Sequence, residues 1–324
     1  MKFVQAAKLD SIVDYGLREG EIPRAGRGEV LIKVAACGVG YVDALVALGR
    51  YQVKPPLPHT PGQEAGGWVE SIGEDVDGFA PGDRVLANVR GGFAEFAVAS
   101  SATVAKIPDR MSFAQAAGFR VNYLTALHGL RDRAMVHPGE RLLVLGAAGG
   151  VGMAAVQVGK VLGVEVIAAA SSEEKRAFAR AQGADEVLDT VPEGWRDRLR
   201  AVCQGKGPNI VFDPVCGPLF EPAFRSLAWG GRHLVVGFVG GPIPVLRANL
   251  TLMKGAALVG VDVRQFLLFE AEKGAPHLAQ LLSWVAEGRL VPAVGRTFAL
   301  DEFASALQFA LTGEGLGKTV IQIA

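Results

Sequence analysis

The feature that most constrains the fold of this chain is the glycine-rich run GAAGGVG at residues 146–152. The apolar run RLLVLG precedes it, and a stretch with helical spacing follows from about Gly150 to Leu162. An apolar strand without polar alternation is typical of a parallel sheet covered on both faces. Glycines between such a strand and a helix let backbone N–H groups and the positive helix end approach a phosphate. The run predicts a dinucleotide-binding turn; tight packing of the helix on the strand is the structural alternative.

The rest of the chain shows two different patterns of apolar and turn-forming residues. Strand and helix patterns alternate from about Arg141 to Phe238, which predicts a doubly wound α/β sheet with right-handed crossovers. Residues 28–106 instead carry short apolar runs broken by Gly, Pro and Asp, which predicts an all-β region. The proline-rich segment PPLPHTPG within it predicts an irregular loop. We expect the tail, with two helices and a closing strand, to rejoin the first domain.

Composition narrows the class of function. The chain has 33 basic and 33 acidic side chains, so no net field draws it to nucleic acid or to an anionic membrane. Its three cysteines, Cys37, Cys203 and Cys216, form no CxxC pair and indicate a reducing compartment. The start MKFVQAAKLD lacks a signal-peptide pattern, and no stretch approaches the roughly 18 apolar residues of a membrane span. We expect a cytoplasmic protein with neither a nucleic-acid nor a membrane partner.

The segment after the second strand of the α/β region bears on the choice of cofactor. NAD sites usually end this strand with Asp or Glu, which binds the ribose 2′-hydroxyl. Here the sequence is AAASSEEKRAF, with Ala170 at the acid position and Ser171, Lys175 and Arg176 after it. A carboxylate would repel a 2′-phosphate, and its absence leaves room for one. We therefore expect NADPH rather than NADH, with solvated surface charges as the alternative interpretation of Lys175 and Arg176.

Ordered motifs along nearly the whole chain carry a family resemblance. They include ACGVGYVDALVALGRYQVKPPLPHTPGQEAGGWVESIGEDV, GGFAEFAV, SFAQAAGFRVNYLTALHGL, VLGAAGGVGMAAVQVGKVLG, GRHLVVGFVGGPIPVLRANLTLMKGAALVGV and GKTVIQI. With them the chain resembles the medium-chain dehydrogenase/reductase superfamily, and within it the zinc-independent NADPH:quinone oxidoreductase group. The resemblance implies an α/β fold with a GroES-like β-barrel catalytic domain, residues 1–118 and 267–324, and a Rossmann doubly wound parallel-sheet domain, residues 119–266.

The same resemblance allows a test for metal. Zinc-dependent relatives carry a ligand Cys in a pattern like CGVCHTD and a ligand His in PGHE. This chain has Gly40 at the position of that Cys and Gln63 at the position of the His, and Cys37 matches a cysteine that is not a ligand. Glycine has no side chain to bind a metal, and three scattered cysteines cannot form a four-cysteine site. We expect no metal.

Hydride transfer from NADPH to an electron-poor acceptor is the chemistry that remains. The acceptor would be a quinone or the β-carbon of an α,β-unsaturated carbonyl, and the protein would supply orientation and electrostatics. Oxygen charge that develops on the acceptor needs a hydrogen-bond donor. We expect Tyr41, Tyr51, Asn122 or a water molecule in this catalytic role. Gly40 departs from an Asn that is common in the family, which affects the predicted positioning of substrate.

The resemblance also implies a set of cofactor contacts and a partner. It places Asn122, Thr125, Phe238 and Val239 near the nicotinamide. It also implies that Asn249 and Lys318 complete the cofactor clamp, the set of residues that hold the dinucleotide. The full predicted cofactor set is Asn122, Thr125, Gly146, Ala148, Gly149, Gly150, Val151, Ser171, Lys175, Arg176, Phe238, Val239, Asn249 and Lys318. The family commonly pairs Rossmann domains edge to edge, so a homodimer is expected.

We therefore expect an NADPH-dependent quinone reductase that works without zinc. The enzymatic alternative is reduction of the double bond of an enone, an enal or an enoyl thioester. The non-enzymatic alternative is an NADPH-binding regulatory or stress protein that has lost turnover.

Overall fold

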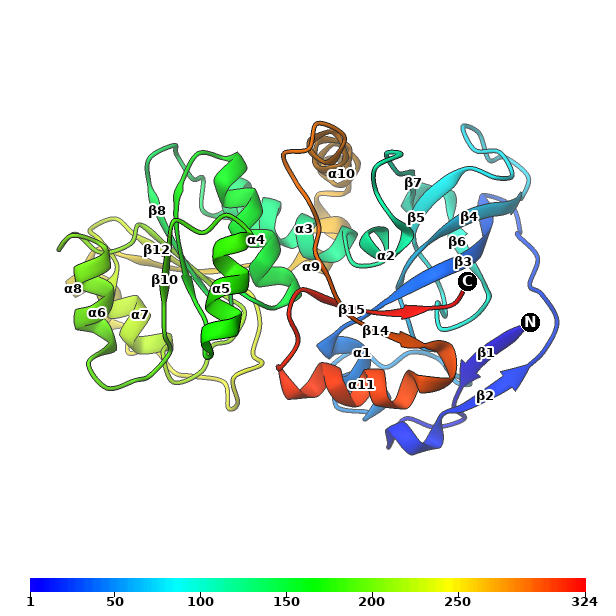
Figure 1. Ribbon diagram of the computed structural model, residues 1–324, viewed down its shortest axis with the longest axis horizontal. Helices are drawn as coiled ribbons and strands as arrows, with labels where there is room; N and C mark the ends of the chain where they lie inside the picture. Colours follow the sequence, from blue (N-terminus) through cyan, green and yellow to red (C-terminus); the bar gives the residue numbers. More distant parts are fainter. The chain divides into compact units, whose positions relative to one another are not determined.

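The computed structural model describes residues 1–324, which divide into two compact units. The barrel unit comprises Met1–Arg120 and Val291–Ala324, and the dinucleotide unit comprises Val121–Leu290. The fold class expected from the sequence is confirmed: one unit is mainly antiparallel β structure and the other is an α/β sheet (Figure 1). None of the helices combines the length and the apolar character that crossing a membrane requires.

The dinucleotide unit is built on a six-stranded sheet of order β10-β9-β8-β11-β12-β13. All neighbouring pairs are parallel, with Val211 aligned to Leu143 on one side and to His233 on the other. The chain order therefore reverses between β8 and β11, which is where open α/β sheets bind ligands. The strands are β8 (Arg141–Leu145), β9 (Glu165–Ala169), β10 (Glu186–Leu188), β11 (Ile210–Asp213), β12 (Arg232–Val235) and β13 (Ala257–Gly260).

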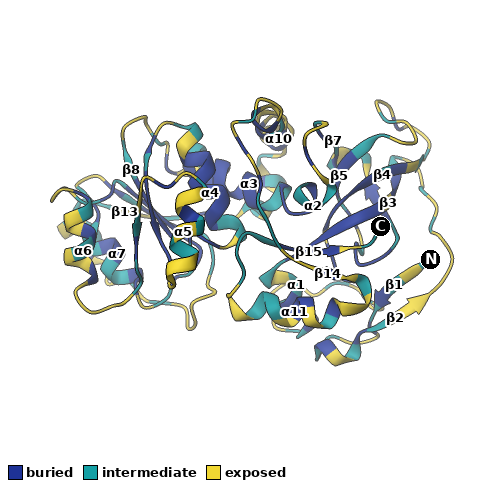
Figure 2. Cartoon of the chain, in the orientation of Figure 1, coloured by how far each residue is buried: buried dark blue, intermediate teal, exposed yellow.

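Helices cover both faces of this sheet (Figure 1), and its central strands are buried (Figure 2). The burial explains why β8 and β9 are apolar on both sides instead of alternating. The helices are α3 (Arg120–Leu127), continued by the π-helix η3 (His128–Arg133), then α4 (Gly150–Val161), α5 (Glu173–Ala181), α6 (Trp195–Val202), α7 (Phe220–Ser226), α8 (Asn249–Lys254), α9 (Val263–Phe269) and α10 (Ala271–Ala286).

The return to the barrel unit comes later in the chain than the sequence predicts. We expected residues 267–324 to belong to the first domain, but the dinucleotide unit runs to Leu290 and includes α10. Side-chain contacts explain the difference, because His277 of α10 lies 2.9 Å from Asp132 (Nε2 to Oδ2) and beside the ring of Phe266 in α9. The amphipathic pattern of α10 indicates a helix but does not indicate which core its apolar face joins.

The barrel unit contains a sheet of order β14-β15-β3-β4-β5-β7, and β6 also pairs with β3. A separate two-stranded sheet joins β1 to β2. The strands are β1 (Lys2–Gln5), β2 (Gly16–Glu19), β3 (Glu29–Val39), β4 (Glu64–Ile72), β5 (Arg84–Asn88), β6 (Phe96–Ser100), β7 (Val104–Lys106), β14 (Val294–Ala299) and β15 (Lys318–Gln322). The helical segments are η1 (Ile12–Asp14), α1 (Tyr41–Ala47), η2 (Ser101–Thr103), α2 (Phe113–Ala116), η4 (Leu300–Glu302) and α11 (Phe303–Thr312).

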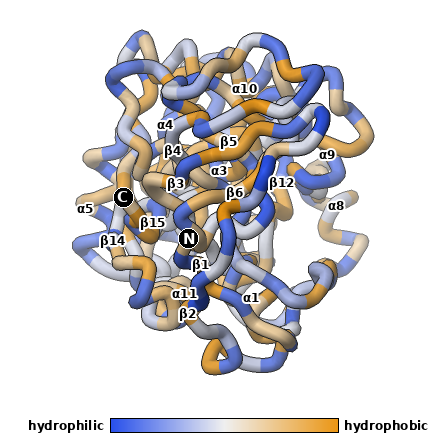
Figure 3. The backbone as a smooth tube through the Cα atoms, turned by 90° about the vertical axis from the view of Figure 1, so that its right-hand side faces the viewer, coloured by the Kyte–Doolittle hydropathy of each residue, from blue (hydrophilic) through white to orange (hydrophobic).

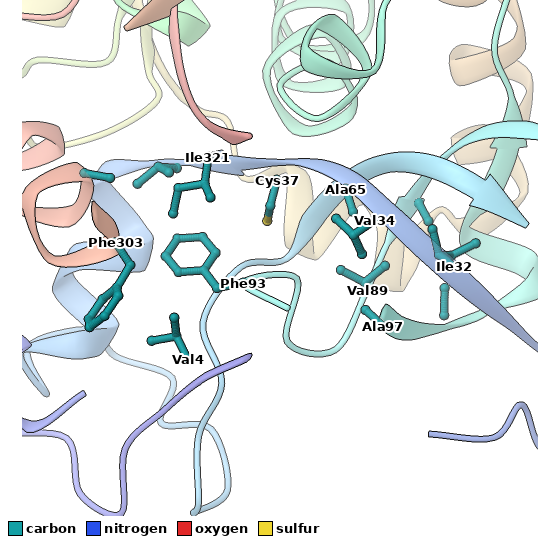
Figure 4. Close-up of a cluster of buried hydrophobic side chains, with 14 of the residues drawn as sticks. Val4, Ile32, Val34, Cys37, Ala65, Val89, Phe93, Ala97, Phe303 and Ile321 are labelled. Atoms are coloured by element: carbon teal, nitrogen blue, oxygen red, sulfur yellow. The ribbon is translucent and has the colours of Figure 1, made fainter. Parts of the chain in front are cut away.

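The core of the barrel unit joins both ends of the chain. Val4, Phe93 and Ile321 belong to one buried apolar cluster with Phe303 of α11 (Figure 4). Hydropathy along the chain changes in short stretches and does not collect in one apolar block (Figure 3). At the start of α2, Ser112 and Gln115 form the reciprocal capping box that their spacing predicts. The C-terminal strand β15 pairs with β3 and β14, so the end of the chain completes the sheet of the barrel unit.

Candidate functional site

The glycine run forms a tight turn between β8 and α4. Gly146 has a φ of +61°, in the left-handed region that favours glycine. A Cβ atom on Gly152 would lie 2.2 Å from the carbonyl oxygen of Gly146, so no larger residue fits there without a backbone shift. Gly149 caps α4 without a side chain of its own. The turn thus brings together the residues predicted for the pyrophosphate, namely Gly146, Ala148, Gly149, Gly150 and Val151.

Asn122 of α3 lies against this turn. Its amide nitrogen is 2.8 Å from the position that a Cβ atom on Gly150 would occupy, and the residue is almost fully buried. Thr125 is one turn further along the same helix, and its hydroxyl donates to the carbonyl of Val121 at 2.6 Å. The structure therefore brings Asn122 to the glycine turn, whereas the hydroxyl of Thr125 is engaged within its own helix.

No charged residue lies between β9 and α5, and the cations Lys175 and Arg176 lie near the start of α5, after Glu173 and Glu174. The Ser172 hydroxyl caps α5 by accepting the N–H of Lys175 at 3.2 Å. The Arg176 guanidinium donates to the carbonyl of Ala170 at 3.2 Å, so its side chain folds back over the end of the strand. Ser171 is exposed next to Ala170. The predicted 2′-phosphate residues therefore gather where β9 meets α5.

Two other predicted cofactor contacts, the Phe238–Val239 segment and Asn249, lie in different parts of the dinucleotide unit. Phe238 and Val239 follow β12, and both are about half exposed. The next residue, Gly240, donates its N–H to the carbonyl of Val215 at 2.8 Å, so this segment is attached to the loop after β11. Asn249 begins α8, which lies at the outer end of the unit, away from α4 (Figure 1), and its amide contacts Met253 in its own helix. The structure does not bring Asn249 to the glycine turn.

In the barrel unit, Lys318 belongs to a cluster of buried charges. Its ammonium lies 3.5 Å from Glu64 Oε2, and the two side chains are 13% and 7% exposed. Burial raises the pKa of Asp43 above its ordinary value, and the nearby Lys318 cation opposes part of that rise. Asp43 also accepts the N–H of Gly40 at 2.8 Å, which caps the start of α1. Lys318, predicted as a cofactor clamp, is thus part of an ion pair whose partner comes from the start of β4.

The two tyrosines predicted as donors lie near the two ends of α1. Tyr41 is its first residue and Tyr51 follows its end, and both are partly exposed. In the proline-rich loop, His59 accepts or donates through Nδ1 to the Tyr15 hydroxyl at 2.7 Å. Burial lowers the pKa of His59 and, on the other side of this bond, burial raises the pKa of Tyr15 to about 12. This pair anchors the loop to the segment that precedes β2.

The donors around Gly40 do not fit a zinc ion. The nearest groups to a Cβ atom built on Gly40 are Asp43 Oδ2 at 3.3 Å and the Lys318 ammonium at 3.5 Å, and an ammonium repels a metal cation. Gln63 is exposed, and Cys37 lies inside the apolar cluster of Figure 4, where burial raises its thiol pKa well above the ordinary value. No group of three or more His, Cys, Asp or Glu side chains is placed to hold a metal ion.

Sequence reasoning missed two buried pairs. One is Glu64 with Lys318, and the other is Asp213 with His233, whose atoms Oδ2 and Nε2 are 3.0 Å apart with both side chains fully buried. A polar residue inside an apolar strand, as in RHLVVGF, was the available signal for His233. Its partner could not be inferred, because the alignment of β12 with β11 is set by the tertiary fold.

The two units define a class of protein. A glycine turn at the first strand of a six-stranded parallel sheet, with a second domain of antiparallel strands, is the construction of a nicotinamide-dinucleotide-dependent oxidoreductase. Residues 150–283 match the family described as zinc-binding dehydrogenase, and residues 26–109 match the alcohol dehydrogenase GroES-like domain. The chain belongs to the medium-chain dehydrogenase/reductase superfamily and is an NAD(P)-dependent oxidoreductase.

Similar proteins agree with this assignment. The chain is 34% identical over 300 residues to a quinone oxidoreductase-like protein 2 homolog of Nematostella vectensis, covering 91% of this chain and 82% of the relative. It is 33% identical over 298 residues to quinone oxidoreductase of Homo sapiens, covering 90% and 88%. A mycobacterial structure complexed with NADPH matches with a TM-score of 0.90 at 29% identity over 99% of this chain and 100% of that one. The CurK enoyl reductase matches with a TM-score of 0.90 at 25% identity over 100% and 99%.

Proposed function

We propose that the chain is an NADPH-dependent reductase that delivers hydride to a quinone without a metal ion. The observation that carries the cofactor choice is the end of β9, where Ala170 replaces a carboxylate and its carbonyl accepts from Arg176. A guanidinium in place of a carboxylate favours a 2′-phosphate over a 2′-hydroxyl. The similarity to a mycobacterial structure that holds NADPH supports the same choice.

The quinone acceptor is supported by the relatives and by the chemistry around Gly40. Two relatives that share about a third of their residues with this chain bear the name quinone oxidoreductase or its like. Alcohol oxidation in zinc-dependent relatives needs a Lewis acid, and next to Gly40 the ammonium of Lys318 accompanies a single carboxylate, that of Asp43, which disfavours a metal ion there. Reduction of a quinone does not need that Lewis acid, because the acceptor is already electron-poor.

In this proposal the residues of the chain bind and orient, and bound NADPH supplies the hydride. The N–H groups at the start of α4 bind the pyrophosphate, and Asn122, buried against Gly150, fixes the turn or the nicotinamide end. Phe238 and Val239 offer partly exposed apolar surface for the nicotinamide ring. Tyr41, Tyr51 or Asn122 donates the hydrogen bond that stabilises negative charge on the acceptor oxygen.

A second candidate activity is reduction of the carbon–carbon double bond of an enone, an enal or an enoyl thioester. The similarity over the full chain to the CurK enoyl reductase favours it. The two activities share the hydride donor and differ in the acceptor. NADPH consumption should therefore be measured with 1,4-benzoquinone, a naphthoquinone, crotonaldehyde and a simple enone. Turnover of quinones supports the first activity, turnover of enones alone supports the second, and tight NADPH binding without turnover supports a regulatory protein.

The cofactor assignment has its own test. Lys175→Ala removes a cation from the first turn of α5, so it should weaken NADPH binding about tenfold while changing NADH binding less than about twofold. Glu174→Ala, which removes an exposed charge from the same turn, is the matched control and should not weaken NADPH. Equal losses for both cofactors with Lys175→Ala would contradict the assignment.

We also propose that the chain forms a homodimer through the free edge of β13. This strand pairs only with β12, so one row of its backbone groups is left for another chain. Leu258 on β13 is 43% exposed, and Trp229, which packs on Gly255 beside it, is 82% exposed. Edge-to-edge pairing of two copies would cover both features at once. Light scattering on the protein and on Leu258→Lys tests this, with a dimer expected for the former and a monomer for the latter.

A further inference from the structure

The loop between β11 and α7, residues 214–219, touches two separate parts of the proposed cofactor site. A methyl group of Val215 lies 2.8 Å from where a Cβ atom on Gly146 would be, so this side chain rests on the first glycine of the turn. The carbonyl of Val215 accepts the N–H of Gly240 at 2.8 Å. The segment that contains Phe238 and Val239 is therefore attached to the glycine turn through Val215.

The backbone of this loop needs external support. Cys216 has a φ of +48°, a left-handed conformation that residues other than glycine seldom adopt. Asp213, the last residue of β11, supplies the support, because its Oδ1 accepts the N–H of Val215 at 2.9 Å and that of Cys216 at 2.7 Å. One carboxylate oxygen thus fixes two consecutive residues of the loop.

His233 holds the other oxygen of the same carboxylate. Its Nε2 donates to Asp213 Oδ2 at 3.0 Å, and the ring lies beside Phe220 and Phe224 in the core. The second ring nitrogen, Nδ1, is buried without a hydrogen-bond partner. A buried polar atom without a partner is unfavourable, and an apolar residue between two phenylalanines would avoid it. The histidine is therefore poorly explained by packing and well explained by its bond to Asp213.

We propose that Asp213 and His233 form a positioning pair for the cofactor. His233 orients the Asp213 carboxylate, the carboxylate fixes Val215 and Cys216, and Val215 holds the glycine turn and the Phe238–Val239 segment in place relative to each other. Neither member of the pair touches the cofactor. The inference rests on the proposed function, since it assigns NADPH to this turn, and it adds residues of the core to the determinants of NADPH affinity.

The test compares NADPH affinity with stability in His233→Phe and His233→Gln. Phenylalanine keeps the ring and removes the donor, so the buried carboxylate loses a partner; we expect the dissociation constant and the KM for NADPH to rise about tenfold. The quinone KM should change less than about twofold. Glutamine can place an N–H donor near the position of Nε2, so His233→Gln should restore NADPH affinity to within about twofold of the original chain.

The matched control is Leu199→Val, which removes one methylene from the buried cluster that contains Phe224 and leaves the Asp213–His233 pair intact. It should lower the melting temperature and leave the dissociation constant for NADPH unchanged. If Leu199→Val weakens NADPH as much as His233→Phe does, the pair acts only through stability and the inference is overturned. Unchanged affinity in His233→Phe overturns it as well.

A second variant covers the case in which His233→Phe does not fold. Val215 is only partly buried, so Val215→Ala should fold and loosen the contact with Gly146, with NADPH binding about threefold weaker. Full affinity in Val215→Ala contradicts the inference. NADPH binding by the unsubstituted chain distinguishes failure of this inference from failure of the proposed function. If the unsubstituted chain does not bind NADPH, the proposed function itself is contradicted.

Discussion

The glycine turn of the dinucleotide unit and the buried charges of the barrel unit are built in opposite ways. The turn closes within seven consecutive residues, and its decisive contact joins the carbonyl of Gly146 to Gly152. The charged cluster joins Glu64, at the start of β4, to Lys318, on the last strand of the chain. Local backbone sterics determine the first, whereas the second exists only after β15 has paired with β3.

The contrast teaches which kind of site a sequence reveals. A turn that requires glycine has glycines at fixed spacing, so it can be recognised from one short stretch of the sequence. A buried ion pair leaves two ordinary charged residues whose partnership depends on the register of distant strands.

We expect the largest loss of stability from a substitution of Gly152 in the glycine turn. Gly152→Ala would place a Cβ atom 2.2 Å from the Gly146 carbonyl oxygen, so the backbone must move. We expect a loss of about 4 kcal/mol in the free energy of unfolding, measured by urea denaturation, and loss of NADPH binding.

Gly149→Ala provides the control for that variant. Its Cβ atom would meet nothing closer than 3.6 Å, so the fold should persist while the added methyl group crowds the proposed pyrophosphate. Stability close to that of the original chain with weaker NADPH binding is the expected result. A Gly152→Ala protein of undiminished stability would show that the turn does not depend on backbone sterics.

Removing one member of the Glu64–Lys318 pair should lower the free energy of unfolding more than removing both charges. Lys318→Met leaves the buried Glu64 carboxylate without its ammonium, and we expect the free energy of unfolding to fall by about 3 kcal/mol. The double variant Glu64→Gln/Lys318→Met removes the Glu64 carboxylate together with its ammonium partner, so part of the loss should be recovered. Thermal denaturation of the single and double variants measures this coupling, and simple additivity would show that the pair is not a unit.

Much of the fold could be predicted from the sequence, and less of the site. The apolar strand before Gly146, the helix after it and the capping box at Ser112 depend on neighbouring residues, so their patterns are sufficient. The domain boundary near residue 267 was wrong because α10 is joined to the dinucleotide unit by His277 and Asp132, which are far apart in sequence. The Asp213–His233 pair was missed for the same reason, since strand register is a tertiary property.

Among these variants, the smallest change is expected for His59 in the proline-rich loop, which affects how stability falls at acidic pH. Burial holds the pKa of His59 below 6.5 in the folded chain, so the unfolded chain binds its proton first as the pH falls. Stability from this residue is therefore complete above pH 6.5 and is lost as the pH falls through the folded pKa. His59→Asn, whose amide oxygen can accept from Tyr15, should show a smaller drop in melting temperature between about pH 6.5 and 5 than the original chain. An equal drop would mean that other groups carry the acid sensitivity.

The most direct test of the proposed activity is steady-state oxidation of NADPH and of NADH by 1,4-benzoquinone, before and after exhaustive treatment with a metal chelator. Ala170 and Arg176 at the end of β9 predict a kcat/KM at least about tenfold higher for NADPH than for NADH. Lys318 beside Gly40 predicts that chelation leaves both rates unchanged. Equal use of the two cofactors, or activity that disappears with the metal and returns with zinc, would contradict the account.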